Sequence, residues 1–492
     1  MSTPIQPTPI SLSKLDTFGD VAAEDDAVLD YFLSTNAVDR IEKNAAFLVL
    51  GRKGAGKTAI VRYFTEGGNN HFSRALNLRG YPWNVHALRI DRGASDIEAY
   101  VSSWRYLLSI EVASLVLAQQ PAKPFDSVRD LETFLQENYG GTRPQLADIL
   151  RPKSLKISKL SLQPSVMGNQ LGGVELERGD KNINFGLELN ALSKSILETA
   201  IGIAKFNGMG RLILHFDELD QGLSELDDQR KKMLIGLILA AREVRRECGG
   251  TVNPVVYLRT DLWDDMQFSD KNKISQTDTL HLEWTDKTLL DLVERRLKAK
   301  LVPEASWDDV AEPDLMRGSQ LKWSHILART FLRPRDVIKF LNVSLSEAKK
   351  RGGEPLKFTN EDIVNSREEY SAYLKNELDD EILPHWPTWD EALQACSGIS
   401  TITFDRKEFE TEYDQRRSAK NPINANDALS LLYRFSVIGY GRRSGYGGSS
   451  WAFQYTDPQA GWDNAASQFK VHLGLKEYAK LREKRAQGTD AE

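Results

Sequence analysis

The chain has 492 residues, of which 41% are hydrophobic and 27% are charged. This composition is typical of a soluble globular protein with more than one domain. The formal net charge of −6 argues against a protein whose whole surface attracts nucleic acid, although a local basic patch is compatible with it. The cysteines, Cys248 and Cys396, suggest neither a metal-ligand cluster nor a disulfide framework, so we expect reduced thiols and a cytoplasmic location.

Neither a membrane span nor a secretion signal is expected from the sequence. The longest apolar stretch, residues 233–241, is shorter than the ~20 residues that cross a bilayer. Residues 1–14 lack the basic start and the apolar block of a signal peptide, and we interpret them as a flexible lead-in. Residues 25–43 carry apolar side chains at helical spacing and predict a helix that packs before the first strand.

Residues 51–58 form the most informative motif in the chain. They read Gly-Arg-Lys-Gly-Ala-Gly-Lys-Thr, which fits the phosphate-binding loop pattern G-x-x-x-x-G-K-[ST] at each fixed position. The glycines let successive backbone N–H groups turn toward phosphate oxygens. We expect the Lys57 ammonium to reach the β- and γ-phosphates of ATP, and the Thr58 hydroxyl to bind Mg²⁺.

The segments on both sides of this loop provide the context that the motif requires. Residues 46–50 are a continuous apolar run, as in a strand buried on both faces of a parallel sheet. Residues 58–64 continue as a helix whose positive N-terminal end would face the phosphates, so a glycine-rich turn without a ligand is the disfavoured alternative. The residues predicted to bind the nucleotide here are Gly51, Arg52, Lys53, Gly54, Ala55, Gly56, Lys57, Thr58 and Ala59.

The next nucleotide motif follows after far more residues than the ~30 of one βαβ unit, so we expect an insertion at about residues 120–190. A strand at residues 85–90 and an apolar-striped helix through residues 104–115 precede the insertion and belong to the core. Within it, residues 155–178 alternate apolar and polar side chains, which predicts a β-hairpin. The hairpin either touches a substrate or a neighbouring subunit, or it is a solvated decoration.

The second nucleotide motif follows a predicted helix over residues 191–206 and is an apolar run that ends in Asp217 and Glu218. A carboxylate at the C-terminal end of a strand lies at the crevice of an open α/β sheet, so we assign Asp217 to Mg²⁺. Glu218 is assigned as the base that orients or deprotonates the attacking water. His215, inside the run, is interpreted as a core imidazole rather than a catalytic one.

A helix over residues 227–247 and a buried strand over residues 254–258 come next. Arg259 and Thr260 leave this strand and are predicted to sense the γ-phosphate. For Arg259, the alternative is an ion pair with Asp261 or Asp264.

Residues 285–385 are predicted to form a helical lid. Residues 331–336 start one of its helices, with a proline in the first turn. Arg333 and Arg335 flank this start, and we assign them as arginine fingers on the γ-phosphate, acting in cis or in trans. The alternative is a pair of salt bridges within the lid.

Residues 386–480 differ in character, because three short helices are followed by a glycine-tipped hairpin. This order predicts a winged-helix-like domain. In a DNA-binding version, the helix over residues 426–435 would enter the major groove, and Arg442 and Arg443 would contact phosphates. Three aromatic side chains alternate along one strand face, which is more typical of a core than of base stacking: Trp451, Phe453 and Tyr455.

These elements predict an α/β fold, with a parallel P-loop NTPase sheet, a helical lid and a C-terminal winged-helix-like domain. The expected divisions are a flexible N-terminus at residues 1–14, an ATPase core at 15–284, the lid at 285–385, the winged-helix-like domain at 386–480 and a flexible tail at 481–492.

Several motifs together resemble bacterial P-loop ATPases of the AAA+/STAND type, and the resemblance spans nearly the whole chain. They are GRKGAGKT, HFDELD, YLRTDLWDDMQFSDKNK with LEWTDKTLLDLVERRL, LRPRDVIKFLN and NEDIVNSREEYSAYLKNELDDE. The resemblance implies an ATPase core, a helical lid and a winged-helix-like domain, in a layout similar to that of origin-recognition-type initiators. KAP-type ATPases are also similar, and they often carry membrane segments in the insertion, where none is expected here. Members of such families are frequently linked to antiviral defence in bacteria or to DNA transactions.

Two classes of function remain open for the expected ATPase, with ATP and Mg²⁺ as its ligands. One is an oligomeric motor or switch in a defence or DNA-linked complex. The other is a non-motor, nucleotide-controlled scaffold or switch that recruits a separate effector protein. A homo-oligomer, an effector protein and DNA bound by the C-terminal domain are therefore the expected partners, and a membrane is not.

Overall fold

The computed structural model describes residues 10–68, 72–78, 96–119, 126–150, 154–156, 165–166, 169–170, 175–177, 185–219, 227–443 and 449–483. The chain divides into two compact units, which are described separately. The sheet unit contains residues 34–52 and 57–283, and the helical unit contains residues 1–33, 53–56 and 284–492. The strand predicted at residues 85–90 lies outside the described residues.

The sheet unit is an α/β fold around a parallel sheet with the strand order β2-β7-β8-β1-β9 among the described residues. The strands are β1 (Leu48–Leu50), β2 (Phe72–Asn77), β7 (Leu212–Asp217), β8 (Val252–Leu258) and β9 (Thr279–His281). All residues of β1, β7 and β8 are buried. The predictions of an α/β fold and of strands covered on both faces are therefore confirmed, and the sheet has the form expected of a P-loop NTPase.

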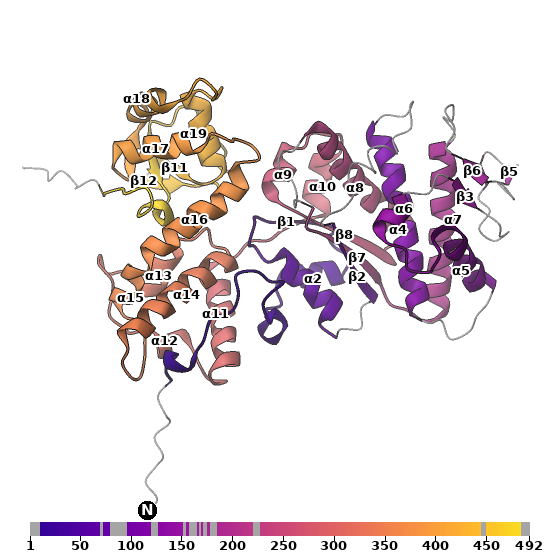
Figure 1. Cartoon of the computed structure of the whole chain (residues 1–492), viewed down its shortest axis with the longest axis horizontal. Coiled ribbons are helices and arrows are strands. Elements are labelled where there is room, and N and C mark those ends of the chain that lie inside the picture. The colour runs from indigo at the N-terminus through magenta and orange to yellow at the C-terminus, as the bar shows by residue number, and fades with distance from the viewer. Residues whose placement is uncertain are drawn as a thin grey trace, which may run out of the picture. The chain divides into compact units, whose positions relative to one another are not determined.

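Helices cover both faces of this sheet. In Figure 1, α2 (Lys57–Glu66) lies on one face, and α8 (Asp228–Glu247) lies on the other with α10 (Lys271–Thr277). Further helices of the unit are α1 (Asn36–Glu42), α5 (Asp126–Tyr139), α6 (Leu146–Leu150) and α9 (Thr260–Asp265). The helices predicted at 58–64 and 227–247 are confirmed.

Helix α4 (Asp96–Ala118) is, within the described residues, long and apolar enough to cross a membrane by length and composition. The most apolar 18-residue segment of α4 is 83% buried. The helix packs against α7 (Phe185–Phe206) and α8. Its buried Arg105 forms ion pairs with Glu243 and Glu247 of α8, at 2.7 and 2.8 Å. These contacts are those of a core helix.

The predicted helix over residues 25–43 is wrong. The structure has a short 3-10 helix, η2 (Val28–Tyr31), and then a separate helix, α1, which begins at Asn36. Thr35 is the N-cap of α1, and its side chain accepts a hydrogen bond from the Ala37 N–H. A chain with an extended capping residue at this point cannot continue as one helix.

Two short antiparallel pairs lie in the predicted insertion. Strand β3 (Ser154–Lys156) pairs with β6 (Glu175–Glu177), with Leu155 opposite Leu176. Strand β4 (Ser165–Val166) pairs with β5 (Asn169–Gln170). The first pair joins the two ends of the segment that the sequence predicts to be a hairpin.

One part of the helical unit is the lid. Its helices are α11 (Asp286–Lys300), α12 (Trp307–Val310), α13 (Lys322–Leu327), α14 (Pro334–Arg351), α15 (Asn360–Asn365) and α16 (Arg367–Ile382). Helix α14 starts with proline at its first position, as predicted, and ends before Gly352, which has a φ of 78°.

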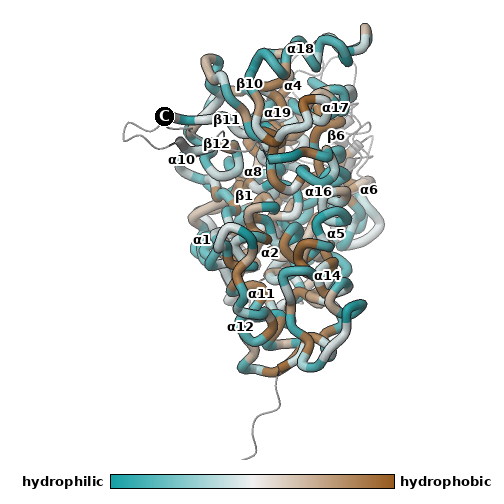
Figure 2. Tube along the Cα trace, turned by 90° about the vertical axis from the view of Figure 1, so that its left-hand side faces the viewer, coloured by the Kyte–Doolittle hydropathy of each residue, from teal (hydrophilic) through white to brown (hydrophobic). Residues whose placement is uncertain are grey.

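The C-terminal domain, residues 386–483, combines three helices with an antiparallel sheet of order β10-β13-β11-β12 among the described residues. The helices are α17 (Asp390–Ile399), α18 (Arg406–Arg416) and α19 (Ala425–Arg434); the strands are β10 (Thr403–Asp405), β11 (Ile438–Arg443), β12 (Ser449–Ala452) and β13 (Gln468–Val471). Figure 2 shows α18 as a largely hydrophilic tube. The three helices and the β11–β12 hairpin follow the predicted order, and the predicted glycine tip lies outside the described residues.

The N-terminal segment joins the core of the lid. Leu12, Leu15 and Phe18 are at most 1% exposed and belong to the same hydrophobic cluster as residues of α11, α14 and α16. The Leu12 N–H donates to the Leu356 carbonyl at 2.9 Å. The sequence places residues 15–33 in the ATPase core, whereas the structure groups them with the lid.

Candidate functional site

The phosphate-binding motif starts at the carboxyl end of β1, in the sheet unit. The Gly51 N–H donates to the Leu258 carbonyl at 3.2 Å, which fixes the entry of the loop against β8. At the other end of the motif, Lys57 begins α2, and its Nζ donates to the Gly51 and Arg52 carbonyls at 3.0 and 3.2 Å. Thr58 and Ala59 follow in the first turn of α2, where helical N–H groups have no intrahelical acceptor.

Residues 53–56, named here the loop tip, contain two glycines in the left-handed region. Gly54 has a φ of 77° and Gly56 a φ of 99°. A Cβ atom on Gly54 would lie 2.7 Å from the Cβ of Arg335, which is closer than real contacts allow. Glycine is therefore required at position 54 for two reasons, backbone conformation and space.

Three successive carbonyl groups of the loop tip accept hydrogen bonds from the helical unit. Arg333 Nη1 donates to the Lys53 carbonyl at 2.9 Å, and the Arg335 N–H donates to the Gly54 carbonyl at 3.4 Å. Trp284 Nε1 donates to the Ala55 carbonyl at 2.9 Å.

These bonds determine where the amide N–H groups of the tip point. In a trans peptide unit, the C=O and the N–H of the next residue point in opposite directions. The N–H groups of Gly54, Ala55 and Gly56 are therefore directed away from the three donors on the lid side. Successive N–H groups turned to one side make an anion-binding concavity.

Arg333 is the most deeply buried of these donors, with 2% of its surface exposed. Its Nε and Nη2 donate to both oxygens of Asp336 at 2.9 Å, and its Nη1 also bonds Glu381. Burial opposes the charge of Arg333, but the Asp336 and Glu381 carboxylates raise its pKa well above the usual value. Arg333 thus has the lid salt bridges of the alternative interpretation, together with a bond to the phosphate loop that the sequence does not predict.

Arg335 and Lys53 both bond Glu377 of α16. Arg335 Nη1 lies 3.2 Å from the Glu377 carboxylate, and its Nε donates to the Val21 carbonyl at 3.1 Å. Lys53 Nζ lies 3.5 Å from Glu377 and also bonds Asp380. The side chain of Lys53 is thus directed at acidic residues of the lid.

Asp217 and Glu218 are at the carboxyl end of β7, in the sheet unit. Asp217 is the last residue of the strand and is 6% exposed. Glu218 follows with a φ of 57°, in the left-handed region. Non-glycine residues in this region are uncommon, and such strain of about 1–3 kcal/mol clusters at active sites and ligand-binding sites. The strain turns the chain at the residue to which the sequence assigns the base.

Asn77 is a candidate that the sequence analysis misses. It is the last residue of β2, it is exposed, and it is in register with Asp217 on the neighbouring parallel strand. An amide at this position lies at the same sheet edge as Asp217 and Glu218. Its signal in the sequence is weak, because β2 has only one buried residue among its first five and so lacks a clear apolar pattern.

Arg259 forms a two-point ion pair with Asp261, which was the alternative left open. Its Nε and Nη2 donate to the two carboxylate oxygens at 3.0 and 2.6 Å. Thr260 is the first residue of α9, after Arg259 as N-cap. Both residues follow β8, at the sheet edge that carries Asp217 and Gly51.

His215 is a core imidazole, as predicted. It is fully buried in β7, and its Nδ1 lies 2.9 Å from the Tyr257 hydroxyl. Burial first, and then the Asp217 carboxylate, raise the pKa of Tyr257 well above its usual value. The hydroxyl of Tyr257 therefore keeps its proton at neutral pH and remains a hydrogen-bond donor beside the acidic end of β7.

The residues present fit a nucleotide with its Mg²⁺. Gly54 and Gly56 both have a positive φ, and a side chain on Gly54 would also clash with Arg335. The carbonyl groups of Lys53 and Ala55 accept hydrogen bonds on one side, so the following N–H groups point to the other side. Thr58 and Asp217 offer a hydroxyl and a carboxylate oxygen, the ligand type that Mg²⁺ prefers.

The charge of the C-terminal domain is balanced, and two of its arginines have partners in the described part of the domain. Acidic and basic residues occur in equal numbers between residues 386 and 480. Arg442 lies 2.7 Å from the Asp457 carboxylate, and Arg406 donates to the carbonyls of Asn464 and Ala466. Phe453 and Tyr455 pack on His472, which supports the interpretation of these aromatic residues as core.

Comparison with known proteins gives one family match, in the lid. Residues 287–379 match the family model described as the FunZ-associated C-terminal helical domain. No curated protein matches the chain.

Solved structures that are similar include the Orc1 protein of Aeropyrum pernix in complex with DNA, with 12% identity, a TM-score of 0.37, and coverage of 94% of this chain and 97% of that chain. Cdc6p of Pyrobaculum aerophilum is similar with 11% identity, a TM-score of 0.31, and coverage of 92% and 96%. The family match covers the lid from α11 to most of α16, and in this part the chain is similar to a FunZ-associated C-terminal helical domain.

Proposed function

We propose that this protein is a P-loop ATPase of the AAA+/STAND type that binds ATP with Mg²⁺ and hydrolyses it to ADP and phosphate. The observation that carries the proposal is the loop tip, where three carbonyls bonded by Trp284 and the lid leave the N–H groups of Gly54, Ala55 and Gly56 directed to the opposite side. An array of this kind suits phosphate oxygens.

The roles proposed for the other residues follow from their chemistry. Lys57 supplies a point charge to the β- and γ-phosphates, and Thr58 and Asp217 hold the metal. Bound Mg²⁺ would neutralise charge on the phosphates. Glu218 orients the attacking water and accepts its proton, and Asn77 stands beside this pair at the sheet edge. Arg259 and Thr260 are proposed as γ-phosphate sensors at the end of β8.

The lid arginines are proposed to act mainly by holding the loop. The Arg333 guanidinium donates four hydrogen bonds, to Asp336, Glu381 and the Lys53 carbonyl. A side chain held in this way suits a positioning role better than a finger that enters another subunit. Arg335 is less buried and remains the candidate for direct phosphate contact.

The wider role proposed is an oligomeric motor or switch in a bacterial defence or DNA-linked complex, located in the cytoplasm. The resemblance of the sequence motifs supports the oligomer, and it also motivates the alternative, a nucleotide-controlled scaffold that recruits a separate effector protein. The C-terminal domain is proposed as a winged-helix-like module, and its balanced charge favours a protein partner over DNA.

Steady-state ATP hydrolysis tests the activity and the DNA partner together. We expect Mg²⁺-dependent turnover that double-stranded DNA leaves unchanged at low and at moderate salt, because acidic and basic residues balance in the C-terminal domain. Stimulation by DNA that falls steeply with salt would contradict the expected partner. Absence of both nucleotide binding and turnover would contradict the ATPase itself.

Mixing of variants tests whether Arg335 acts within its own chain. We expect Arg335→Ala to lower turnover at least about tenfold, less than the ~10³-fold loss typical of a finger in trans. Its backbone N–H bonds Gly54, and its side chain is held by Val21 and Glu377, so we expect Arg335 to act in cis and addition of Lys57→Ala protein not to restore activity. Recovery on mixing would show action across a subunit boundary, and Arg351→Ala, at the far end of α14, is the matched control.

A further inference from the structure

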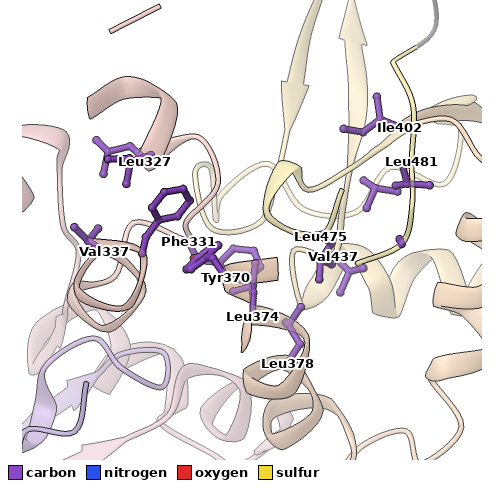
Figure 3. Close-up of a cluster of buried hydrophobic side chains, with 14 of the residues drawn as sticks. Leu327, Phe331, Val337, Tyr370, Leu374, Leu378, Ile402, Val437, Leu475 and Leu481 are labelled. Atoms are coloured by element: carbon purple, nitrogen blue, oxygen red, sulfur yellow. The ribbon is translucent and has the colours of Figure 1, made fainter. Parts of the chain in front are cut away.

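The lid and the C-terminal domain share one hydrophobic core. Figure 3 shows Phe331, Tyr370 and Leu374 of the lid beside Val437 and Leu475 of the C-terminal domain. All five are at most 3% exposed and belong to one cluster. The 3-10 helix η4 (Leu473–Leu475) packs directly on α16. A displacement of the C-terminal domain therefore disturbs the lid.

Phe331 lies between the arginine that holds the loop tip and two aromatic rings of the C-terminal domain. The guanidinium carbon of Arg333 is 5.1 Å from the centroid of the Phe331 ring. The Phe331 ring is also 4.4 Å from the His472 ring and 5.4 Å from the Tyr455 ring, centroid to centroid. Phe331 and His472 are 3% and 1% exposed, so water does not separate these groups.

On the lid side, Phe331 and Arg333 are fixed to each other. The Phe331 N–H donates to Asp336 Oδ2 at 3.0 Å, and the same oxygen accepts Arg333 Nε at 2.9 Å. Leu332 between them has a φ of 51°, a strained conformation for a large side chain. Strain of this kind persists only where the surrounding contacts hold the residue in place. Because Leu332 is held in this way and Asp336 bonds both of its neighbours, a shift of Phe331 also moves Arg333.

On the domain side, the two rings are held by the sheet and its flanking turns. The His472 N–H donates to the Val437 carbonyl at 2.9 Å, and His472 Nδ1 accepts the Gly474 N–H at 3.1 Å. The Tyr455 N–H donates to Ser436 Oγ at 3.1 Å. The position of Phe331 is thus set by residues that are more than 100 positions further along the chain.

We infer that the C-terminal domain regulates the nucleotide affinity of the phosphate loop through Phe331, which positions Arg333 on the Lys53 carbonyl. This inference rests on the proposed function. A protein partner that pulls the C-terminal domain from the lid removes the support of Phe331, Arg333 loses its bond to Lys53, and the loop N–H groups lose their fixed direction. Because coupling of two equilibria is reciprocal, bound nucleotide also stabilises the seating of the domain.

The first test compares two substitutions of buried phenylalanine in the full chain. Phe331→Leu removes the ring between Arg333 and His472. Phe409→Leu is the matched control, because Phe409 is fully buried in the C-terminal domain between Phe404 and Tyr413. We expect Phe331→Leu to raise the Kd for ATP about 5- to 150-fold, and Phe409→Leu to leave it unchanged at a similar loss of thermal stability. Tyr455→Leu, a change within the C-terminal domain, should raise the Kd in the same direction as Phe331→Leu.

The second test is amide hydrogen exchange with and without ATP. In the wild-type protein and in Phe409→Leu, ATP should slow exchange of the His472 amide, and in Phe331→Leu it should not. Equal Kd values for the two phenylalanine variants, or ATP protection of His472 that survives Phe331→Leu, would overturn the inference. Failure of the wild-type protein to bind ATP at all would instead contradict the proposed function.

Discussion

Glu218→Gln should bind ATP normally and hydrolyse it about 10²- to 10⁴-fold more slowly than the wild-type protein. Glutamine keeps the size of the side chain and its capacity to accept a hydrogen bond, so the nucleotide site retains its shape. It lacks the carboxylate that accepts a proton from the attacking water. The positive φ of Glu218 at the end of β7 turns the backbone and so sets the direction of the Glu218 side chain. We therefore expect the loss of hydrolysis to depend on this one side chain.

Single-turnover hydrolysis and equilibrium binding of a fluorescent ATP analogue separate the two effects of this change. Glu132→Gln is a suitable control, because Glu132 is an exposed residue of α5 in the same unit. If Glu218→Gln hydrolyses ATP as fast as the wild-type protein, Glu218 is not the base. In that case Asp217 or a solvent-mediated path has to be considered.

Lys57→Ala should abolish measurable ATP binding, with a loss of at least about 100-fold in affinity. Truncation of one partner of a charged, hydrogen-bonded pair costs about 2–5 kcal/mol, and each 1.4 kcal/mol is tenfold in Kd. The variant also loses the bonds from Nζ to the Gly51 and Arg52 carbonyls, so the start of the loop becomes less ordered.

Isothermal titration with ATP and Mg²⁺ measures this loss directly. Lys43→Ala removes an exposed lysine just before β1 and controls for a general change in charge. Thermal unfolding without nucleotide should be similar for the two variants. Retention of ATP affinity by Lys57→Ala would show that another group carries the phosphate contact.

The sequence predicts the carboxyl ends of β1 and β7 well, because the sequence signals for these sites are local. The motif at residues 51–58 requires a buried strand before it and a helix after it, and β1 and α2 provide them. The apolar run before Asp217 forms a central strand, β7, that is fully buried. In both places, periodicity and a short motif depend on neighbours within about ten residues.

The sequence does not predict how the lid arginines are used, because their partners are distant in the chain. Arg333 bonds Glu381, which is 48 positions away, and Lys53, which is 280 positions away. A local pattern identifies a cation at a helix start, but it carries no information on which acceptor lies opposite. The direction of these side chains follows from the tertiary packing of α14 on α16.

The break in the predicted helix at residues 25–43 has a different cause. Apolar spacing alone favours one helix there, and the local signal against it is Thr35, a helix-capping residue. The segment before it follows the lid instead, because Asp26 pairs with Arg296 of α11 at 2.9 Å while both side chains are at most 5% exposed. A buried ion pair of this kind is expensive to break from one side, at about 3–5 kcal/mol.

The hydrophobic cluster of the lid has a consequence for synthesis on the ribosome. It contains Leu12 and Phe18 from one end of the chain and Leu475 and Leu481 from the other. Phe18 leaves the ribosome 278 positions before Arg296, the residue that binds its carbonyl. The sheet unit can thus be complete while the N-terminal segment still lacks its partners, and an apolar segment in that interval is a natural binding site for a chaperone.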